Sequence, residues 1–120
     1  MEYKHFKTNL GKENDYPKLV RDNIPEIVER IKAKEVKIRI LEDNEEYLKF
    51  LLKKVEEEAC ELASAKDKEH IVEEMADVME LIDTILEFND LNLEIVRKVQ
   101  KEKAEVRGGF KKRILMLEKV

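Results

Sequence analysis

The sequence predicts an all-α protein, a four-helix-type bundle, from three observations. Apolar residues recur at helical spacing along most of the chain, only three glycines and two prolines interrupt it, and 43% of its residues are charged. Balanced glutamate and lysine at this density are typical of amphipathic helices whose exposed faces carry ion pairs. The chain has 120 residues, which suits one domain. We expect a single helical domain over residues 16–120, preceded by a polar N-terminal arm over residues 1–15 that shows no periodicity.

Pro25 and Asp43 mark the beginnings of the first two helices. Proline favours an early helical position, so a helix should begin at Ile24 and end near Lys34. Apolar and charged residues then alternate over residues 36–40, which predicts one short extended segment. That segment has no strand partner in this chain, so it would pair with a second copy or lie across the helices. Asp43 to Glu46 resembles a capping box and begins a long second helix.

Two further helices follow, each with a signal at its end. Asp67 is suited to cap a third helix, which should stop near Asn89-Asp90. A fourth helix is expected over residues 92–107, and Gly108-Gly109 would end it. The remaining residues, 110–120, form a basic and then apolar tail.

The overall composition excludes several classes of protein. The 24 basic and 28 acidic residues give a net charge of -4, which excludes nucleic-acid binding through bulk positive charge. The single cysteine, Cys60, excludes an intramolecular disulfide and suits a reducing compartment. No apolar stretch approaches the ~18 residues of a membrane span or resembles a signal peptide. We therefore expect a cytoplasmic protein with neither membrane nor nucleic-acid partners.

Four acidic residues fall on the flanks of the second and third helices rather than on their outer faces. At about 100° per residue, Glu58 and Glu61 share one flank of the second helix with Lys54. Glu74 and Asp77 share a flank of the third helix in the same way. The turn between the helices is short, so we expect an antiparallel central hairpin whose acidic flanks line one groove. In that register Glu61 faces Glu74. One turn further along, Glu58 faces Asp77.

Carboxylates that meet in a partly apolar groove repel one another unless hard cations lie among them. Ligand sets made only of oxygen favour Mg²⁺ or Mn²⁺. A di-iron site fits less well, because it needs a Glu-x-x-His pattern on two helices and His70 is the only histidine in the expected helices. The other interpretation is a solvated acidic flank on a highly charged bundle.

Three segments resemble a known family. Glu57-Glu58-Ala59-Cys60-Glu61 and, after twelve residues, Glu74-Met75-Ala76-Asp77 are similar to the EExxE…ExxD signature of the MazG-type, all-α nucleoside triphosphate pyrophosphohydrolases. Lys18 to Ile27 resembles the KLVRDxIPEI opening of a small single-domain branch, which is labelled phosphoribosyl-ATP pyrophosphohydrolase-like. Lys103 to Phe110 resembles the KxxxRGGF close of that branch. The resemblance covers residues 16–117, with Asn23 standing where the branch more often has lysine.

This resemblance implies hydrolysis of a nucleoside triphosphate to the monophosphate and pyrophosphate, with Mg²⁺ or Mn²⁺. The metal ligands that it implies are Glu58, Glu61, Glu74 and Asp77. The catalytic residues that it implies are Glu57, which would orient or deprotonate the attacking water, Glu58 and Lys54. The substrate-binding candidates are Lys54, Arg21, Asp22, Lys103 and Arg107. For the last four, a local ion pair, a helix cap or the helix dipole is the alternative explanation.

Family members associate, so the resemblance also implies a homodimer or homotetramer. The expected role is removal of non-canonical or surplus nucleotides. A second possibility within the same chemistry is phosphoribosyl-ATP hydrolysis in histidine biosynthesis. A possibility of another class is a non-catalytic helical module that binds a nucleotide or a protein. No motif indicates which base is recognised.

Overall fold

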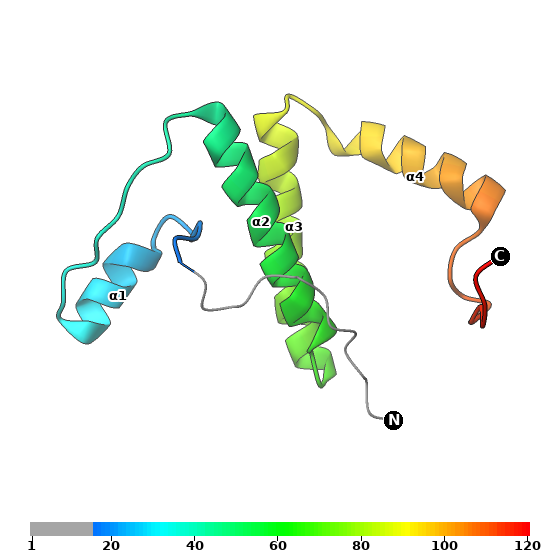
Figure 1. Ribbon diagram of the computed structural model, residues 1–120, viewed down its shortest axis with the longest axis horizontal. Coiled ribbons are helices and arrows are strands. Elements are labelled where there is room, and N and C mark those ends of the chain that lie inside the picture. The colour runs from blue at the N-terminus through cyan, green and yellow to red at the C-terminus, as the bar shows by residue number, and fades with distance from the viewer. Residues whose placement is uncertain (1–15) are drawn as a thin grey trace. The chain divides into compact units, whose positions relative to one another are not determined.

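The computed structural model describes residues 16–120, and the predicted N-terminal arm over residues 1–15 lies outside the described residues. Residues 16–120 form four helices and no strand, which confirms the all-α prediction. The helices are α1 (Ile24–Lys32), α2 (Asn44–Ala63), α3 (Lys68–Phe88) and α4 (Leu93–Arg107), shown in Figure 1. None of these four is both long enough and apolar enough to cross a membrane.

The chain divides into two structural units, the first ending at Ile82 and the second running from Asp83 to Val120. In its described part, the first unit contains α1, α2 and most of α3. The second unit contains the last turns of α3, all of α4 and the C-terminal tail.

Helix α1 begins with Pro25 in its first turn and ends at Ala33, whose φ of 49° places it in the left-handed region. Residues 35–42, which include the expected extended segment, form neither helix nor strand. Arg39 in this link donates two hydrogen bonds to the Glu46 carboxylate, at 2.7 and 3.2 Å. This paired contact fixes the link to the first turn of α2.

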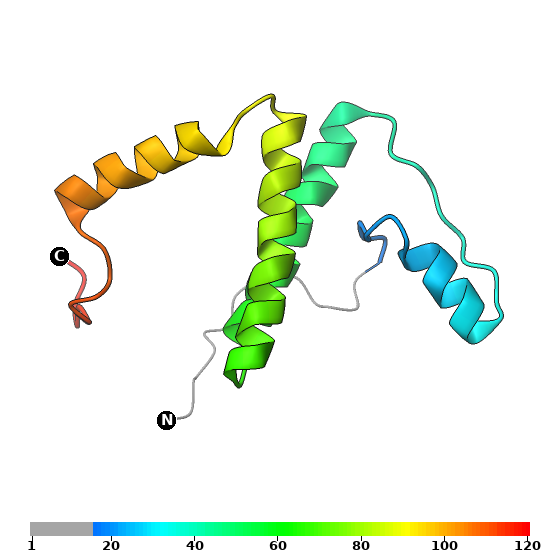
Figure 2. The same cartoon turned by 180° about the vertical axis from the view of Figure 1, so that it is seen from behind.

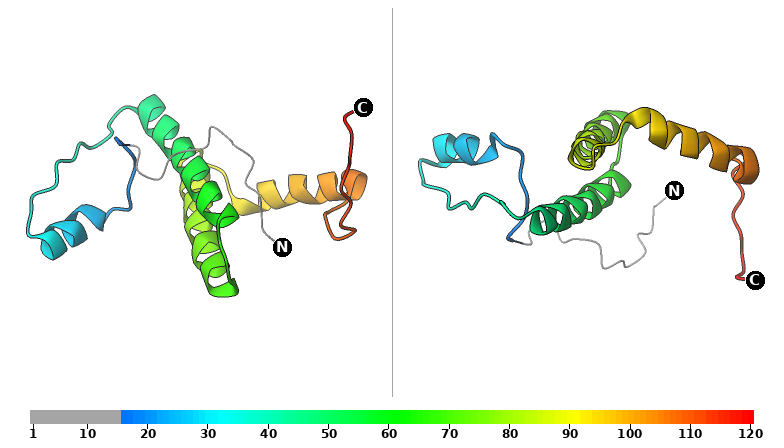
Figure 3. Two further views of the ribbon diagram at one scale, coloured as in Figure 1. Left: turned by 60° about the horizontal axis from the view of Figure 1, so that its bottom comes forward. Right: turned by 90° about the horizontal axis from the view of Figure 1, so that it is seen from above.

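The beginnings of α2 and α3 use the caps that the sequence predicts. The Asp43 carboxylate accepts a hydrogen bond from the Glu46 backbone N–H at 2.9 Å. The Asp67 carboxylate accepts one from the His70 N–H at 2.8 Å. Only residues 64–67 separate the two helices, which lie side by side in opposite views (Figures 1 and 2) and in views from below and above (Figure 3).

In the second unit, Asn92 caps α4 by accepting a hydrogen bond from the Ile95 N–H at 3.0 Å. Helix α4 ends at Gly108, whose φ of 77° suits glycine and whose N–H donates to the Ala104 carbonyl at 2.8 Å. The tail that follows contains no helix, and its Phe110 is 97% exposed.

The buried core of the described chain is small. Among residues 16–120, only Leu51 on α2 and Leu86 on α3 are buried, and of these two only Leu51 is fully buried. Helices α1 and α4 contain no buried residue, and they leave large apolar side chains exposed, such as Ile31 at 77% and Val106 at 86%. The apolar faces of these two helices are therefore accessible in a single chain.

Candidate metal and phosphate site

The structure brings acidic side chains of α2 and α3 together in two overlapping groups. Glu58, Glu74 and Asp77 each offer a carboxylate oxygen, and these oxygens lie within 4.8 Å of one another. Glu61 and Glu74 form the second group with His70, under the same distance limit. Glu74 belongs to both groups, so all four predicted metal ligands meet in one region. We call these four acids, Glu58, Glu61, Glu74 and Asp77, the carboxylate cluster.

The carboxylate cluster is partly shielded from solvent, and this shielding affects the protonation of Glu58. The Glu58 and Glu74 side chains are only 13% and 12% exposed. Burial raises the pKa of Glu58 above its ordinary value, and the neighbouring Asp77 charge raises it further, while Lys54 acts in the opposite direction. A divalent cation bound here would favour the ionised carboxylates, and an all-oxygen set suits Mg²⁺ or Mn²⁺.

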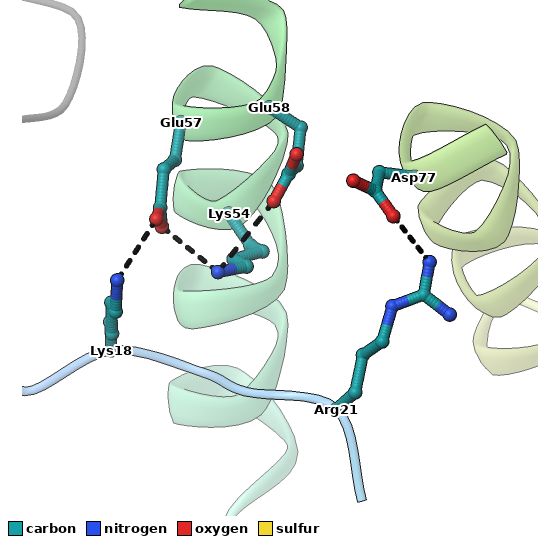
Figure 4. Close-up of polar contacts among 6 residues, drawn as sticks. All are labelled: Lys18, Arg21, Lys54, Glu57, Glu58 and Asp77. Atoms are coloured by element: carbon teal, nitrogen blue, oxygen red, sulfur yellow. Dashed lines mark hydrogen bonds and ion pairs between the residues drawn. The ribbon is translucent and has the colours of Figure 1, made fainter. Parts of the chain in front are cut away.

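Two lysines share the Glu57 carboxylate beside the cluster (Figure 4). Lys18 Nζ donates to Glu57 Oε1 at 3.1 Å, and Lys54 Nζ donates to Glu57 Oε2 at 3.1 Å. Lys54 Nζ also lies 3.7 Å from Glu58 Oε1, which connects the lysines to the cluster. Burial acts to lower the pKa of Lys18, but the hydrogen bond and charge of Glu57 outweigh it and raise that pKa overall. The Lys18 ammonium is therefore charged at neutral pH.

The segment that precedes α1 contacts both α2 and α3. Figure 4 shows that Lys18 reaches Glu57 on α2, whereas Arg21 reaches Asp77 on α3. Arg21 Nη2 lies 2.6 Å from Asp77 Oδ1, and Arg21 Nη1 lies 4.0 Å from Glu80 Oε1. These contacts place two cationic side chains from one segment beside the carboxylates.

Three predicted substrate-binding residues, Asp22, Lys103 and Arg107, are exposed. Asp22 is in the turn that leads into α1. Lys103 and Arg107 are on α4, which belongs to the second unit.

Sequence reasoning gave no site role to Lys18 or His70. His70 Nε2 lies 3.3 Å from Glu74 Oε1. The signal for His70 was its spacing of four residues from Glu74, which puts both side chains on one helix face. Lys18 stands at the start of the KLVRDxIPEI-like segment, but its contact with Glu57 spans 39 residues and has no local signature.

In comparisons with known proteins, no family model, no curated protein and no solved structure matches this chain. The resemblance carried by the three sequence segments therefore stays a prediction.

Proposed function

We propose that this protein is a Mg²⁺-dependent nucleoside triphosphate pyrophosphohydrolase, which converts a nucleoside triphosphate and water to the monophosphate and pyrophosphate. The observation that carries this proposal is the grouping of Glu58, Glu74 and Asp77 oxygens within 4.8 Å, beside cations on Lys54 and Arg21. Carboxylates suit the metal ions that accompany a polyphosphate, and the cations suit the polyphosphate itself. The motif resemblance supports the same reaction.

The proposed assembly covers the apolar helix faces that a single chain leaves exposed to solvent. In it, α2 and α3 form an antiparallel hairpin at the centre of a four-helix-type bundle, and a dimer or tetramer covers the exposed apolar faces of α1 and α4. The exposure of residues such as Ile31 and Val106 supports this assembly. Light scattering coupled to size-exclusion chromatography tests it, and a monomer at micromolar concentration would contradict it. The proposed location is the cytoplasm.

Each side chain of the site has a role in the proposed reaction. The four acids of the carboxylate cluster would hold Mg²⁺, which would supply positive charge for the phosphates and a water of lowered pKa. Lys54 and Arg21 place positive charge where the phosphates gain negative charge in the transition state. Each Glu57 oxygen accepts one lysine hydrogen bond and keeps a second lone pair, with which Glu57 orients or deprotonates the attacking water.

The substrates that we propose are non-canonical or surplus nucleoside triphosphates. Phosphoribosyl-ATP is the second candidate within the same chemistry, since it presents the same triphosphate to the cluster. A non-catalytic helical module that binds a nucleotide or a protein is the candidate of another class. The complete set of four acids favours catalysis over that module, because a module without a metal role does not need them.

The decisive experiment measures pyrophosphate release from a panel of canonical and modified nucleoside triphosphates and phosphoribosyl-ATP. Each substrate is tested with Mg²⁺, with Mn²⁺ and with a chelator. Glu74→Gln is compared with Glu73→Gln, because Glu73 is the exposed neighbour on the same helix. We expect chelator-sensitive release that Glu74→Gln lowers by at least about 100-fold and Glu73→Gln retains, since outer partners of a metal already cost 10–100-fold.

The result for the whole panel also separates the two classes of function. Absence of release from every substrate would overturn the enzyme proposal. If Mg²⁺ then also failed to raise the unfolding temperature while a nucleotide or protein still bound, the binding module would be the better explanation.

A further inference from the structure

We propose that Lys18 is a phosphate-binding residue, held beside Lys54 by the Glu57 carboxylate, and that it recognises the pyrophosphate part of the substrate. This inference rests on the proposed function and adds a residue and a binding position to it. It assigns Lys18 to the phosphate farthest from the reacting phosphorus.

Two contacts hold the Lys18 ammonium group in place. Its ammonium group lies 3.1 Å from Glu57 Oε1 and 5.0 Å from the centre of the Tyr16 ring. The Lys18 side chain is 21% exposed, and the Glu57 side chain is 12% exposed. A surface lysine is usually solvated and loses considerable rotamer freedom when it is ordered. The two contacts and the shielding therefore place this ammonium group at a defined position.

The Glu57 carboxylate carries less negative charge than its two lysine partners carry positive charge. Glu57 accepts a hydrogen bond from Lys54 as well as from Lys18, so one carboxylate holds two ammonium groups of like charge. An ion pair that only fastened the segment to α2 would need one lysine. The three side chains together carry a net positive charge, and an anion with several oxygens would balance it. The Glu58 carboxylate faces Lys54, and its charge also acts on Lys18, so it offsets this surplus of positive charge. The surplus would appear when a metal ion holds Glu58.

The two lysines lie at different places relative to the carboxylate cluster. Lys54 Nζ lies 3.7 Å from Glu58, a member of the carboxylate cluster, while Lys18 contacts Glu57 outside the cluster. In the reaction, the water oxygen bonds to the α-phosphorus, and the bond from that phosphorus to the oxygen bridging to the β-phosphate breaks. The bridging oxygen keeps the electron pair and leaves in pyrophosphate, with release of one proton. If the carboxylate cluster holds the metal ion beside the α-phosphorus, Lys54 would face the nearer phosphate of the leaving group and Lys18 the farther one.

The test compares the affinities of inorganic pyrophosphate and a nucleoside monophosphate by calorimetry in the presence of Mg²⁺. We expect Lys18→Gln to weaken pyrophosphate binding by about tenfold, the effect of one charge-assisted hydrogen bond. The affinity of the monophosphate should stay within about twofold of the original value. Lys18→Arg should retain pyrophosphate binding, because it keeps the charge.

The matched control is Lys53→Gln, since Lys53 is exposed on α2 next to Lys54 and loses the same charge. Equal pyrophosphate affinity in Lys18→Gln and the unsubstituted protein would overturn the inference, and so would an equal loss for both ligands. If Lys18→Gln does not fold, nuclear magnetic resonance of the unsubstituted protein tests the inference. The Lys18 ¹⁵Nζ resonance should shift when pyrophosphate is added, and an unmoved resonance would overturn the inference.

These outcomes are separable from those for the proposed function. If the protein hydrolyses triphosphates and Lys18→Gln leaves pyrophosphate affinity unchanged, only the role of Lys18 is wrong. If it neither hydrolyses a triphosphate nor binds pyrophosphate with Mg²⁺, the proposed function is wrong and this inference falls with it.

Discussion

The Arg21 guanidinium lies 2.6 Å from the carboxylate of Asp77, a residue 56 positions further along the chain. Arg21 comes from the segment before α1, whereas Asp77 belongs to α3 and to the carboxylate cluster. Asp77 would thus serve two cations in the proposed reaction, the guanidinium and a divalent metal. Arg21 and the metal should therefore compete for this carboxylate when no nucleotide is bound.

The first prediction is that Arg21→Gln tightens metal binding in the absence of nucleotide. Arg21 is 54% exposed, so its ion pair is worth no more than a surface pair, and the gain in Mn²⁺ affinity should be about two- to fivefold. Titration followed by electron paramagnetic resonance of free Mn²⁺ measures it. Arg30→Gln is the control, because Arg30 is exposed on α1. Weaker Mn²⁺ binding in Arg21→Gln than in the control would show that Arg21 supports the metal rather than competing with it.

The second prediction is that Glu58→Gln stabilises the metal-free protein at neutral pH. Burial raises the pKa of Glu58 above its ordinary value of 4.5, so the folded chain binds this proton more tightly than the unfolded chain does. The cost of the ionised group is therefore absent below pH 4.5 and grows as the pH rises through the raised pKa. Near pH 7 with a chelator, we expect an unfolding temperature higher by about 2–5 °C in Glu58→Gln.

Two comparisons complete that experiment. The difference between the two proteins should become small at pH 4, which is below the ordinary pKa of 4.5 and further below the raised pKa. Glu56→Gln, an exposed position on the same helix, should show no comparable gain at pH 7. A Glu58→Gln protein that was less stable at pH 7 with the chelator present would contradict the sign derived from burial.

The third prediction concerns the pH dependence of metal binding. A proton on Glu58 must leave before its oxygen can bind a cation, so metal binding releases protons and weakens as the pH falls toward the raised pKa of Glu58. The rise in unfolding temperature caused by Mg²⁺ should be smaller at pH 5 than at pH 7. In Glu58→Gln this pH dependence should be reduced. An Mg²⁺ effect that is the same at both pH values would argue against Glu58 as a metal ligand.

Much of the fold could be predicted because its signals are local. Asp43 accepts the cap hydrogen bond at the beginning of α2, and Asn92 accepts the one at the beginning of α4. As expected, Pro25 stands in the first turn of α1 and Gly108 follows the last turn of α4. Each of these signals acts within a few residues of the helix end that it determines. The grouping of the acids was predictable as well, because helical spacing and a short turn set which positions of two successive helices meet.

Two of the cations beside the carboxylates, Lys18 and Arg21, were harder to predict than Lys54, because their contacts are not local. Lys18 meets Glu57 across 39 residues, and Arg21 meets Asp77 across 56. No periodicity relates such positions, since they depend on how the segment before α1 lies against α2 and α3. A local argument could explain Arg21 only as a cap or a nearby ion pair, and it gave Lys18 no role.

The last prediction compares alanine substitutions at the two adjacent glycines that follow α4, Gly108 and Gly109. Gly108 has a φ of 77°, which a residue with a Cβ rarely adopts, whereas Gly109 has no such left-handed φ. An added Cβ would meet no atom within 4 Å at either position, so only the backbone conformation distinguishes them. Gly108→Ala should therefore destabilise the end of α4 by about 1–2 kcal/mol. Gly109→Ala should cost much less.

Hydrogen exchange over residues 104–108 measures this effect, because the Gly108 N–H donates to the Ala104 carbonyl in the last turn. Faster exchange there in Gly108→Ala than in Gly109→Ala would assign Gly108 to the termination of the helix. Equal exchange in the two proteins would contradict that assignment.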